Sequence, residues 1–467
     1  MTGKTASTRL LWFRRDLRLS DNPALHAAAG TGVSGTGDRH AGAAVLPVFV
    51  VDPLLWDAAG APRRAYLVRS LRALDHALRE RGGRLVVRYG EPADEIARLV
   101  AECGADEVHA ASDFGPYGRE RDSRVEDALA DRDVAFVRTG SPYAVAPGRV
   151  VKNDGTPYQV FTPFFRAWTE HHRRGPLAEP DRVDWVSLPG DDLPPEPDAD
   201  VPGLPPAGEE AALAHWAEFR DRGLDRYAEL RDRADLSGTS RLSVHLRFGE
   251  VHPRTLLAEI GSEASVFRSE LCWREFYADV LWHRPKSGRA YLRPEFAGMA
   301  YDTGDDADEM YDAWCQGRTG YPFVDAGMRQ LLAEGWMHNR VRMVVASFLV
   351  KDLHQEWTRG ARHFMRRLAD GDLASNSHNW QWVAGSGTDA SPFFRVFNPV
   401  AQGRKFDPDG NYVRRYVPEL RGIAGAAVHE PWKLKDGLPA GYPERVVDHA
   451  EEREVALVRY DKMRRQR

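Results

Sequence analysis

Asp370-Gly-Asp-Leu-Ala-Ser-Asn-Ser-His-Asn-Trp-Gln-Trp382 brings carboxylates, amides and two Trp together within a short stretch of the sequence. Ser375 or Asn376 can begin a helix here, because both side chains accept hydrogen bonds from the free N–H groups of a first turn. Two positions along a helix correspond to about 200° of rotation, so Trp380 and Trp382 should point to nearly opposite sides. One Trp can therefore enter the core while the other lines a cavity, although a plain helix with two core Trp is the commoner explanation.

The chain around this stretch has 467 residues, of which 42% are hydrophobic and 28% are charged. This length suggests two or more domains, and the composition is ordinary for a soluble globular protein. The three cysteines form no C-x-x-C pair, which argues against a disulfide framework or a zinc site and suits a reducing compartment. No apolar run approaches about 18 residues and we find no signal-peptide pattern, so we expect a cytoplasmic protein that enters no membrane.

The net charge of −5 is unevenly distributed along the chain. Seven basic residues accompany two acidic ones between 340 and 367, whereas ten acidic residues accompany Arg182 alone between 179 and 210. A basic face can therefore exist despite the acidic mean, which leaves binding to a polyanion open. A solvated helix surface is the usual alternative for such a charge run.

Residues 8–140 alternate between apolar runs and helical patterns. The strand-like runs are 8–13, 43–51, 85–88, 107–110 and 134–137, and the helical patterns between them are 62–81, 92–103 and 117–130. Continuous apolar strands separated by helices predict a doubly wound parallel α/β sheet. A stretch rich in Pro and acidic residues follows, and almost all later patterns are helical. We predict an α/β domain over 1–140, an interdomain linker over 141–210 and an all-α domain over 211–467.

Two motifs that often bind ligands lie in the wrong context. Residues 30–35 match G-x-G-x-x-G, but they follow a helical Ala run and precede a strand, the reverse of a dinucleotide site. We interpret them as part of a Gly-rich insert over 30–42 that has no evident role. Asp370 and Asp372 form a D-x-D pair without a further acidic or His ligand at metal spacing, so we predict no metal site.

Polar and aromatic residues gather at three places in the helical part. The loop 238–243 offers hydroxyl groups before a helix, where a phosphate can bind. Asn339 and Met343 are neighbours one helical turn apart, beside basic residues. One helical face, at spacing i, i+3, i+4 and i+7, comprises Glu270, Trp273, Arg274 and Tyr277. A surface ion pair between its charged members is the alternative to a binding face.

The chain resembles the DNA photolyase/cryptochrome family over nearly its whole length. The motifs that carry the resemblance are Trp12-Phe-Arg-Arg-Asp-Leu-Arg-Leu-Ser-Asp-Asn-Pro23, Phe161-Thr-Pro-Phe164, Thr239-Ser-Arg-Leu-Ser243, Trp273-Arg-Glu-Phe-Tyr277, Thr319-Gly-Tyr-Pro322, Trp336-Met-His-Asn-Arg340, Asp370-Gly-Asp372 and Phe397-Asn-Pro399. Within the family the chain looks like a class I cyclobutane pyrimidine dimer photolyase. The alternative is a cryptochrome, a blue-light photoreceptor that signals and does not repair DNA.

The resemblance implies that the helical domain binds FAD without a Gly-rich loop. It implies a buried pair between Arg274 and Asp370 beside the flavin, and Asn376 at flavin N5. Phe267 stands where many members have Trp. The residues that the resemblance assigns to FAD are Tyr227, Thr239, Ser240, Arg241, Leu242, Ser243, Phe267, Glu270, Arg274, Asn339, Asp370, Asp372 and Asn376.

The implied reaction is electron transfer from light-excited, reduced FAD to a pyrimidine dimer that has left the DNA duplex. Glu270 would hydrogen-bond the dimer, while Asn339 and Met343 would complete the cavity. Met343 stands where (6-4) photolyases place His, which favours cyclobutane dimers. The residues assigned to UV-damaged DNA are Arg231, Trp273, Arg340, Trp382, Arg395 and Lys405, and the two Trp would stack on the dimer.

Further assignments from the resemblance concern electron supply and light harvesting. A photoreduction chain from the surface to oxidised flavin would comprise Trp380, Trp357 and Trp314. Residues 112–122 look like those of deazaflavin-binding members, so the expected antenna is 8-hydroxy-5-deazaflavin, with methenyltetrahydrofolate as the alternative. Asp113 and Arg247 would contact the antenna. His378 departs from a common Gly, and we expect it at a harmless surface position. We expect a monomer.

Overall fold

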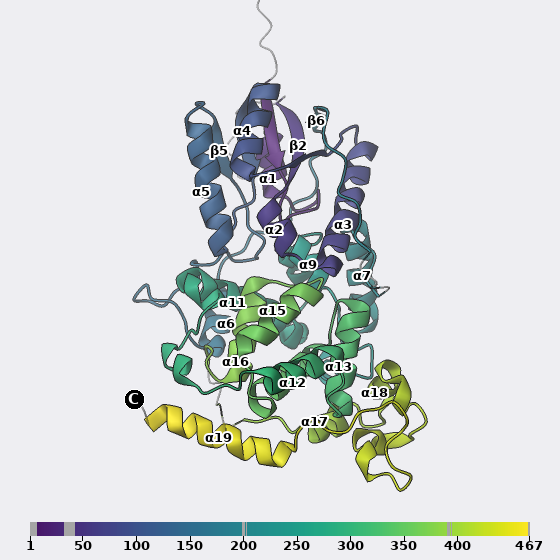
Figure 1. Ribbon diagram of the computed structural model, residues 1–467. Helices are drawn as coiled ribbons and strands as arrows, with labels where there is room; N and C mark the ends of the chain where they lie inside the picture. Colours follow the sequence, from purple (N-terminus) through teal and green to yellow (C-terminus); the bar gives the residue numbers. More distant parts are fainter. Residues whose placement is uncertain are drawn as a thin grey trace, which may run out of the picture.

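The computed structural model describes residues 7–31, 43–198, 201, 203–389, 393 and 395–465. An α/β lobe lies at the top of Figure 1, and a helical lobe lies below it. This architecture confirms the predicted fold class of a parallel α/β domain followed by an all-α domain. Most of the Gly-rich segment 30–42 falls outside the described residues.

Within the described residues, the parallel sheet has six strands, of which five follow one another in the order β3-β2-β1-β4-β5 and the sixth, β6 (Asp184–Trp185), pairs with β2. The five are β1 (Thr8–Trp12), β2 (Ala44–Val51), β3 (Val86–Tyr89), β4 (Ala105–Ala110) and β5 (Ala135–Arg138). The helices of this lobe are α1 (Pro23–Ala28), α2 (Pro53–Ala58), α3 (Ala61–Glu80), α4 (Pro92–Cys103) and α5 (Pro116–Ala130). Strands β1 and β2 are buried along almost their whole length, which explains the unbroken apolar runs that predicted them.

The segment that we predicted as a linker contains regular structure. Helix α6 (Phe161–Glu170) packs against α11 (Ser265–His283) of the helical lobe. The short strand β6 (Asp184–Trp185) pairs in parallel with β2 of the α/β lobe. The segment 141–210 therefore contributes to both lobes.

The helical lobe surrounds the largest apolar core of the described residues. The helices of this lobe, besides α11, are α7 (Glu209–Arg222), α8 (Tyr227–Leu230), α9 (Ser243–Phe248), α10 (Pro253–Ala258), α12 (Asp305–Gln316), α13 (Pro322–Glu334), α14 (Asn339–Ser347), α15 (Trp357–Arg367), α16 (Leu373–Ala384), α17 (Pro399–Phe406), α18 (Asn411–Tyr416) and α19 (His449–Arg465). Helix α14 continues into a π-helical turn, Phe348–Asp352, a feature often found near functional sites. None of the described helices is long and apolar enough to cross a membrane.

Helix α16 forms where the sequence predicted it, but a different residue caps it. The N-cap is Asp372, whose carboxylate accepts from the Ser375 N–H at 3.0 Å. The helix ends at Gly385, whose φ of 79° lies in the left-handed region that favours glycine. Trp380 is buried and Trp382 is half-buried, as the spacing predicted. Asp, Ser and Asn are nearly equivalent as N-cap residues, so their identity alone did not show that the helix begins after Asp372 and not after Ser375 or Asn376.

The two lobes meet through close backbone packing and a buried polar network. A Cβ on Gly60 would lie 1.6 Å from the Arg366 carbonyl oxygen, so only glycine permits this contact between α3 and α15. At the same boundary, Glu250 accepts hydrogen bonds from Tyr66 Oη at 2.8 Å and Ser70 Oγ at 2.6 Å. Because these buried donors and acceptors are paired, the lobes are held in one arrangement.

Candidate active site

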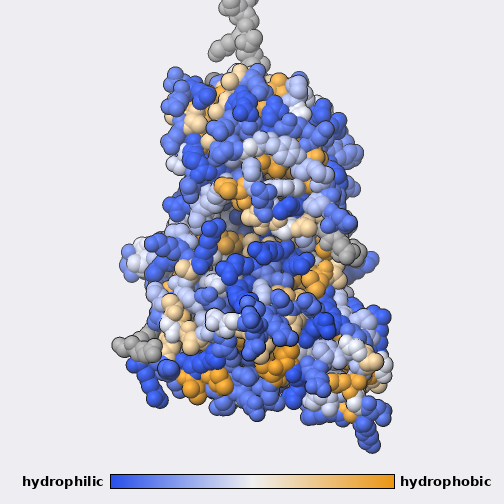
Figure 2. All heavy atoms as spheres, in the orientation of Figure 1, coloured by the Kyte–Doolittle hydropathy of each residue, from blue (hydrophilic) through white to orange (hydrophobic). Residues whose placement is uncertain are grey.

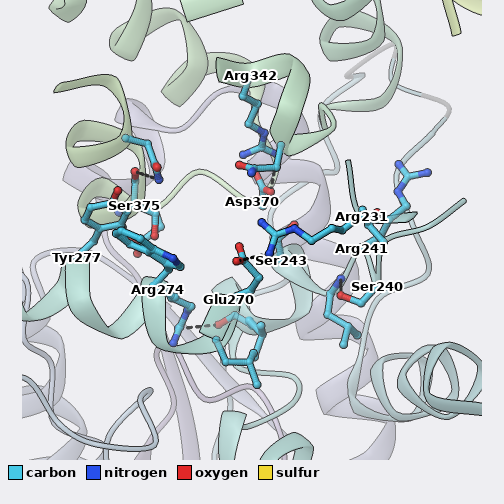
Figure 3. A pocket seen from close by; sticks show the side chains of 18 of the residues that line it. Arg231, Ser240, Arg241, Ser243, Glu270, Arg274, Tyr277, Arg342, Asp370 and Ser375 are labelled. Carbon is cyan, nitrogen blue, oxygen red and sulfur yellow. Dashed lines mark hydrogen bonds and ion pairs between the residues drawn. The ribbon is translucent and has the colours of Figure 1, made fainter. Parts of the chain in front are cut away.

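A cavity of about 500 Å³ lies in the helical lobe (Figure 3). Its wall contains most of the predicted site residues. Those assigned to FAD, the dimer or DNA are Tyr227, Arg231, Thr239, Ser240, Arg241, Leu242, Ser243, Phe267, Glu270, Trp273, Arg274, Asn339, Arg340, Met343, Asp370, Asp372 and Trp382, and Arg247, which was assigned to the antenna, lines the cavity as well. A smaller cavity of about 80 Å³ is lined by Asn376 and Trp380, and it shares Asn339, Met343 and Asp370 with the first. The predicted residues that line neither cavity are Asp113, Trp314, Trp357, Arg395 and Lys405.

Helix α11 presents Glu270 and Trp273 to the cavity. The Glu270 carboxylate accepts from Arg231 Nη1 at 2.6 Å, so the two predicted substrate contacts are already paired (Figure 3). The Trp273 ring lies against Phe161, with centroids 3.6 Å apart and planes only 7° from parallel. Phe161 covers one face of the indole, and its orientation is therefore set before any ligand arrives.

The predicted pair between Arg274 and Asp370 is wrong. Arg274 donates to the carbonyl oxygens of Pro142 at 3.0 Å and Leu246 at 3.1 Å, because this side of α11 faces the segment that leaves the α/β lobe. The partner of Asp370 is Arg342 on α14, at 2.8 Å between Nη2 and Oδ2 (Figure 3). The second carboxylate oxygen, Oδ1, is buried and has no hydrogen-bond partner among the described residues. A bound ligand can complete it.

Asp372 is held by charges from both lobes. Its carboxylate pairs with Arg15 Nη2 at 2.9 Å, directly across the boundary between the lobes. Burial by itself raises the pKa of Asp372, but Arg15, Arg247 and Arg274 together lower it to about 2. The group is therefore a fixed negative charge at the cavity wall.

The loop 238–243 is held in shape by Trp336, a residue to which the sequence analysis assigned no role. Arg241 has a φ of 49°, which is uncommon for a residue with a side chain and frequent at functional sites. Trp336 Nε1 donates to Ser243 Oγ at 3.2 Å, and the Arg241 guanidinium lies 4.2 Å from the Trp336 ring. The loop thus presents hydroxyl groups at the start of α9, where a phosphate fits. The sequence signal that could have revealed this role is the position of Trp336 directly before the motif Met-His-Asn-Arg.

Helix α16 orients Asn376 towards the smaller cavity. The Asn376 Nδ2 donates to the Ala361 carbonyl oxygen at 3.0 Å, which leaves its side-chain oxygen free to accept. The expectation that His378 is a surface residue is wrong, since its side chain is fully buried. Its ring nitrogens contact Ser287 Oγ at 2.9 Å and the Ala374 carbonyl oxygen at 2.7 Å. Burial lowers the pKa of His378 to about 4.

The three Trp of the predicted photoreduction chain do not reach solvent. Trp380 has its ring centroid 6.1 Å from that of Trp314. Trp314 has no exposed surface and Trp357 has 1% exposed. Trp357 packs edge-on against Tyr291, at 6.0 Å between centroids. The expected path from the surface therefore requires further residues.

The basic run 340–367 does not form one face. Arg340 lines the large cavity and pairs with Asp232 at 2.8 Å, whereas Lys351 is buried and donates to the Arg395 carbonyl oxygen at 2.8 Å. Phe364 on α15 and Leu368, the residue that follows this helix, line the small cavity. The exposed arginines of this helix, which line neither cavity, are Arg362, Arg366 and Arg367. Figure 2 shows the hydrophilic surface over α15.

The predicted antenna contacts lie at the boundary between the lobes. Asp113 pairs with Arg121 at 3.2 Å and lies 3.9 Å from Arg15, so its carboxylate is engaged. Arg247 donates to the Gly371 carbonyl oxygen at 2.8 Å and lines the large cavity. Arg15 therefore lies between the carboxyl ends of the strands and the cavity.

Comparisons with known proteins agree with this arrangement. Residues 9–182 match the DNA photolyase family, and residues 267–462 match the family described as FAD binding domain of DNA photolyase. The deoxyribodipyrimidine photo-lyase of Streptomyces griseus is 45% identical, over 96% of this chain and 98% of the relative. The corresponding protein of Escherichia coli K12 is 38% identical, over 98% and 99%.

Solved structures give the same result. A class III photolyase from Agrobacterium tumefaciens superposes with a TM-score of 0.91 at 38% identity, over 99% of both chains. A cryptochrome from Synechocystis superposes with a TM-score of 0.86 at 26% identity, over 97% of this chain and 99% of the other.

Proposed function

This chain belongs to the DNA photolyase family, and we propose that it is a deoxyribodipyrimidine photo-lyase that splits cyclobutane pyrimidine dimers in UV-damaged DNA under blue light. Its C-terminal part is the FAD-binding domain of that family. The observation that carries the proposal is the hollow formed by the two neighbouring cavities, which share Asn339, Met343 and Asp370 in their walls. Together they bring the residues assigned to FAD next to those assigned to the dimer.

The inner wall of the hollow fits FAD. Bound FAD, when reduced and excited by light, supplies the electron that splits the cyclobutane ring. Arg342 fixes Asp370 so that the unpaired Oδ1 is available to the cofactor, and the hydroxyl loop before α9 suits its phosphates. Asn376 offers an amide oxygen as acceptor because its Nδ2 is already engaged. A neutral amide accepts a hydrogen bond without delivering a proton, which suits a site that stores an electron donor.

The outer wall suits a pyrimidine dimer. Unpairing a damaged base costs a few kcal/mol, and stacking on an aromatic side chain stabilises the bound state by about 1–3 kcal/mol per base. Trp273 and Trp382 supply the aromatic surfaces, while Met343 adds an adaptable apolar contact. Glu270 hydrogen-bonds the pyrimidine edge and steadies the charge that develops there. Arg231 holds this carboxylate in the cavity at 2.6 Å.

The class and the antenna are finer parts of the proposal. We assign class I from the whole set of family motifs and 8-hydroxy-5-deazaflavin from residues 112–122, with class III and methenyltetrahydrofolate as the alternatives. Asp113 and Arg247 both lie near Arg15 at the boundary between the lobes, where an antenna would be close to FAD. Mass spectrometry of chromophores extracted from protein expressed in a deazaflavin-making host tests the assignment. Recovery of a folate instead would overturn it.

A blue-light repair assay tests the enzyme assignment. The full chain, loaded with FAD and chemically reduced, should remove dimers from UV-treated oligo-dT in light and not in darkness. Glu270→Ala should reduce the repair yield sharply, whereas Glu309→Ala, an exposed change on α12, should not. FAD binding without repair by the wild-type chain would contradict the proposal and favour the second candidate, a cryptochrome-type photoreceptor.

A further inference from the structure

From Trp380, aromatic ring contacts continue outward through Trp314. Trp380 and Trp314 are in ring contact, with centroids 6.1 Å apart and planes at 70°. Trp314 is completely buried, and its Nε1 donates to the Val345 carbonyl oxygen at 3.0 Å. An electron that enters from solvent therefore needs one more oxidisable side chain outside Trp314.

Tyr311 occupies that place. It lies one helical turn before Trp314 on α12, with ring centroids 6.0 Å apart and planes 23° from parallel. Tyr311 is half-buried and so lies nearer to solvent than Trp314, which has no exposed surface. Its hydroxyl donates to the Arg359 carbonyl oxygen at 3.2 Å. The Arg359 guanidinium lies 4.1 Å from the Tyr311 ring and pairs with Asp308 at 2.8 Å.

We propose that Tyr311 is the surface end of the electron path Tyr311–Trp314–Trp380, which leads to the FAD cavity. The inference rests on the proposed function, because it assumes that light-excited, oxidised flavin is the final acceptor. In the outer step, Tyr311 gives one electron to oxidised Trp314 and its phenolic proton to water, which leaves a neutral tyrosyl radical. An external thiol then gives a hydrogen atom to the phenolic oxygen and becomes a thiyl radical.

The surroundings of Tyr311 favour this coupled loss of electron and proton. Burial raises the pKa of Tyr311 above its ordinary value, so the phenol is protonated at neutral pH. The guanidinium of Arg359 over the ring disfavours a radical cation, since two positive charges would face each other. Electron loss therefore requires proton loss, and the step should slow in heavy water.

A second outward branch serves as an internal control. Trp357 contacts Tyr291, with centroids 6.0 Å apart and planes at 75°, and the Tyr291 hydroxyl donates to Tyr301 Oη at 3.2 Å. In the described part of the chain, the ring contacts of Trp380 are with Trp314 and Phe364 and do not include Trp357. The geometry therefore favours the exit at Tyr311 over that at Tyr291.

Flash photolysis of the full chain with oxidised FAD tests the inference. The transient spectrum of the wild type should pass from a tryptophanyl to a tyrosyl radical, and electron paramagnetic resonance should identify the latter. Tyr311→Phe keeps the ring and its packing, but it should abolish the tyrosyl signal and slow steady photoreduction by thiol severalfold. Tyr291→Phe, the matched control, should keep both the signal and the rate.

Two results would overturn the inference. One is a tyrosyl signal that persists in Tyr311→Phe, together with a wild-type radical-transfer rate that is unchanged in heavy water. The other is loss of the tyrosyl signal in Tyr291→Phe. FAD content and circular dichroism of each variant show whether it is folded. Repair by the chemically reduced wild type is measured separately, so a failure of the proposed function is distinct from a failure of the Tyr311 assignment.

Discussion

At the scale of single residues, the ion pair between Arg342 and the buried Asp370 carboxylate stabilises the cavity wall. Removing one partner of a buried ion pair leaves an uncompensated charge and costs about 3–5 kcal/mol. We expect Arg342→Ala to lower the free energy of unfolding by about that amount, because Asp370 already has one unpaired oxygen. Urea denaturation measures it. Arg222→Ala, which breaks an exposed pair, should change stability by less than about 1 kcal/mol. Equal losses in both variants would contradict the argument.

His378 gives a prediction of pH dependence. Its pKa is about 4 in the folded protein, below the ordinary 6.5, so the unfolded chain binds a proton that the folded chain does not. Stability should therefore fall as pH falls from 6.5 to 4, by about 1.4 kcal/mol per unit from this group alone. Denaturation of His378→Asn across this range should show a shallower slope than the wild type. His76→Asn, at an exposed site, should keep the wild-type slope.

The predictions for Arg274 and His378 show what could not be inferred from the sequence. Spacing placed Glu270, Trp273 and Arg274 on one helix, and all three line the large cavity. It gave no information on which groups Arg274 would contact, because its partners, the Pro142 and Leu246 carbonyl oxygens, come from other segments of the chain. His378 had no hydrophobic pattern to mark it as buried, since Ser287 and a backbone carbonyl satisfy its ring.

At the scale of elements, the contact between α15 and α16 fixes Trp380. A Cβ on Gly360 would lie 2.1 Å from Trp380 Cη2, closer than atoms can approach. We expect Gly360→Ala to destabilise the protein by about 1–3 kcal/mol and to shift the Trp380 ring. Thermal denaturation and near-ultraviolet circular dichroism measure the two effects. Arg362→Ala, an exposed change on the same helix, should leave both unchanged. An unchanged aromatic spectrum in Gly360→Ala would show that this packing is not needed.

The elements themselves were predictable to different degrees. Strands β1 and β2 were found because burial on both faces leaves an unbroken apolar signal. The strand β6 was missed because it has only two residues within a segment rich in Pro and acidic residues, and its partner β2 is distant in sequence. The N-cap of α16 was misplaced by a few residues for a similar reason, since Asp, Ser and Asn are nearly equivalent at that position.

At the scale of the whole molecule, basic residues that are close in the sequence lie on different surfaces, and basic residues that are distant in the sequence lie together. Lys405 lies within 5.2 Å of the Phe406 ring, and Arg340 at the cavity lies 4.7 Å from the same ring. The arginines exposed on α15 line neither of the two cavities. Proximity in sequence to Arg340 therefore does not imply a shared partner.

Salt dependence of DNA binding can separate these two basic surfaces. Each phosphate contact contributes about 0.9 to the slope of log K against log salt. We expect Lys405→Ala to reduce the slope for dimer-containing duplex by about that amount, because the side chain is exposed beside Arg340. Arg366→Ala removes an equal charge from α15 and should leave the slope unchanged. A reduced slope in Arg366→Ala would mean that DNA reaches the face that α15 presents to solvent, and the path of the duplex over the helical lobe would then have to include both surfaces.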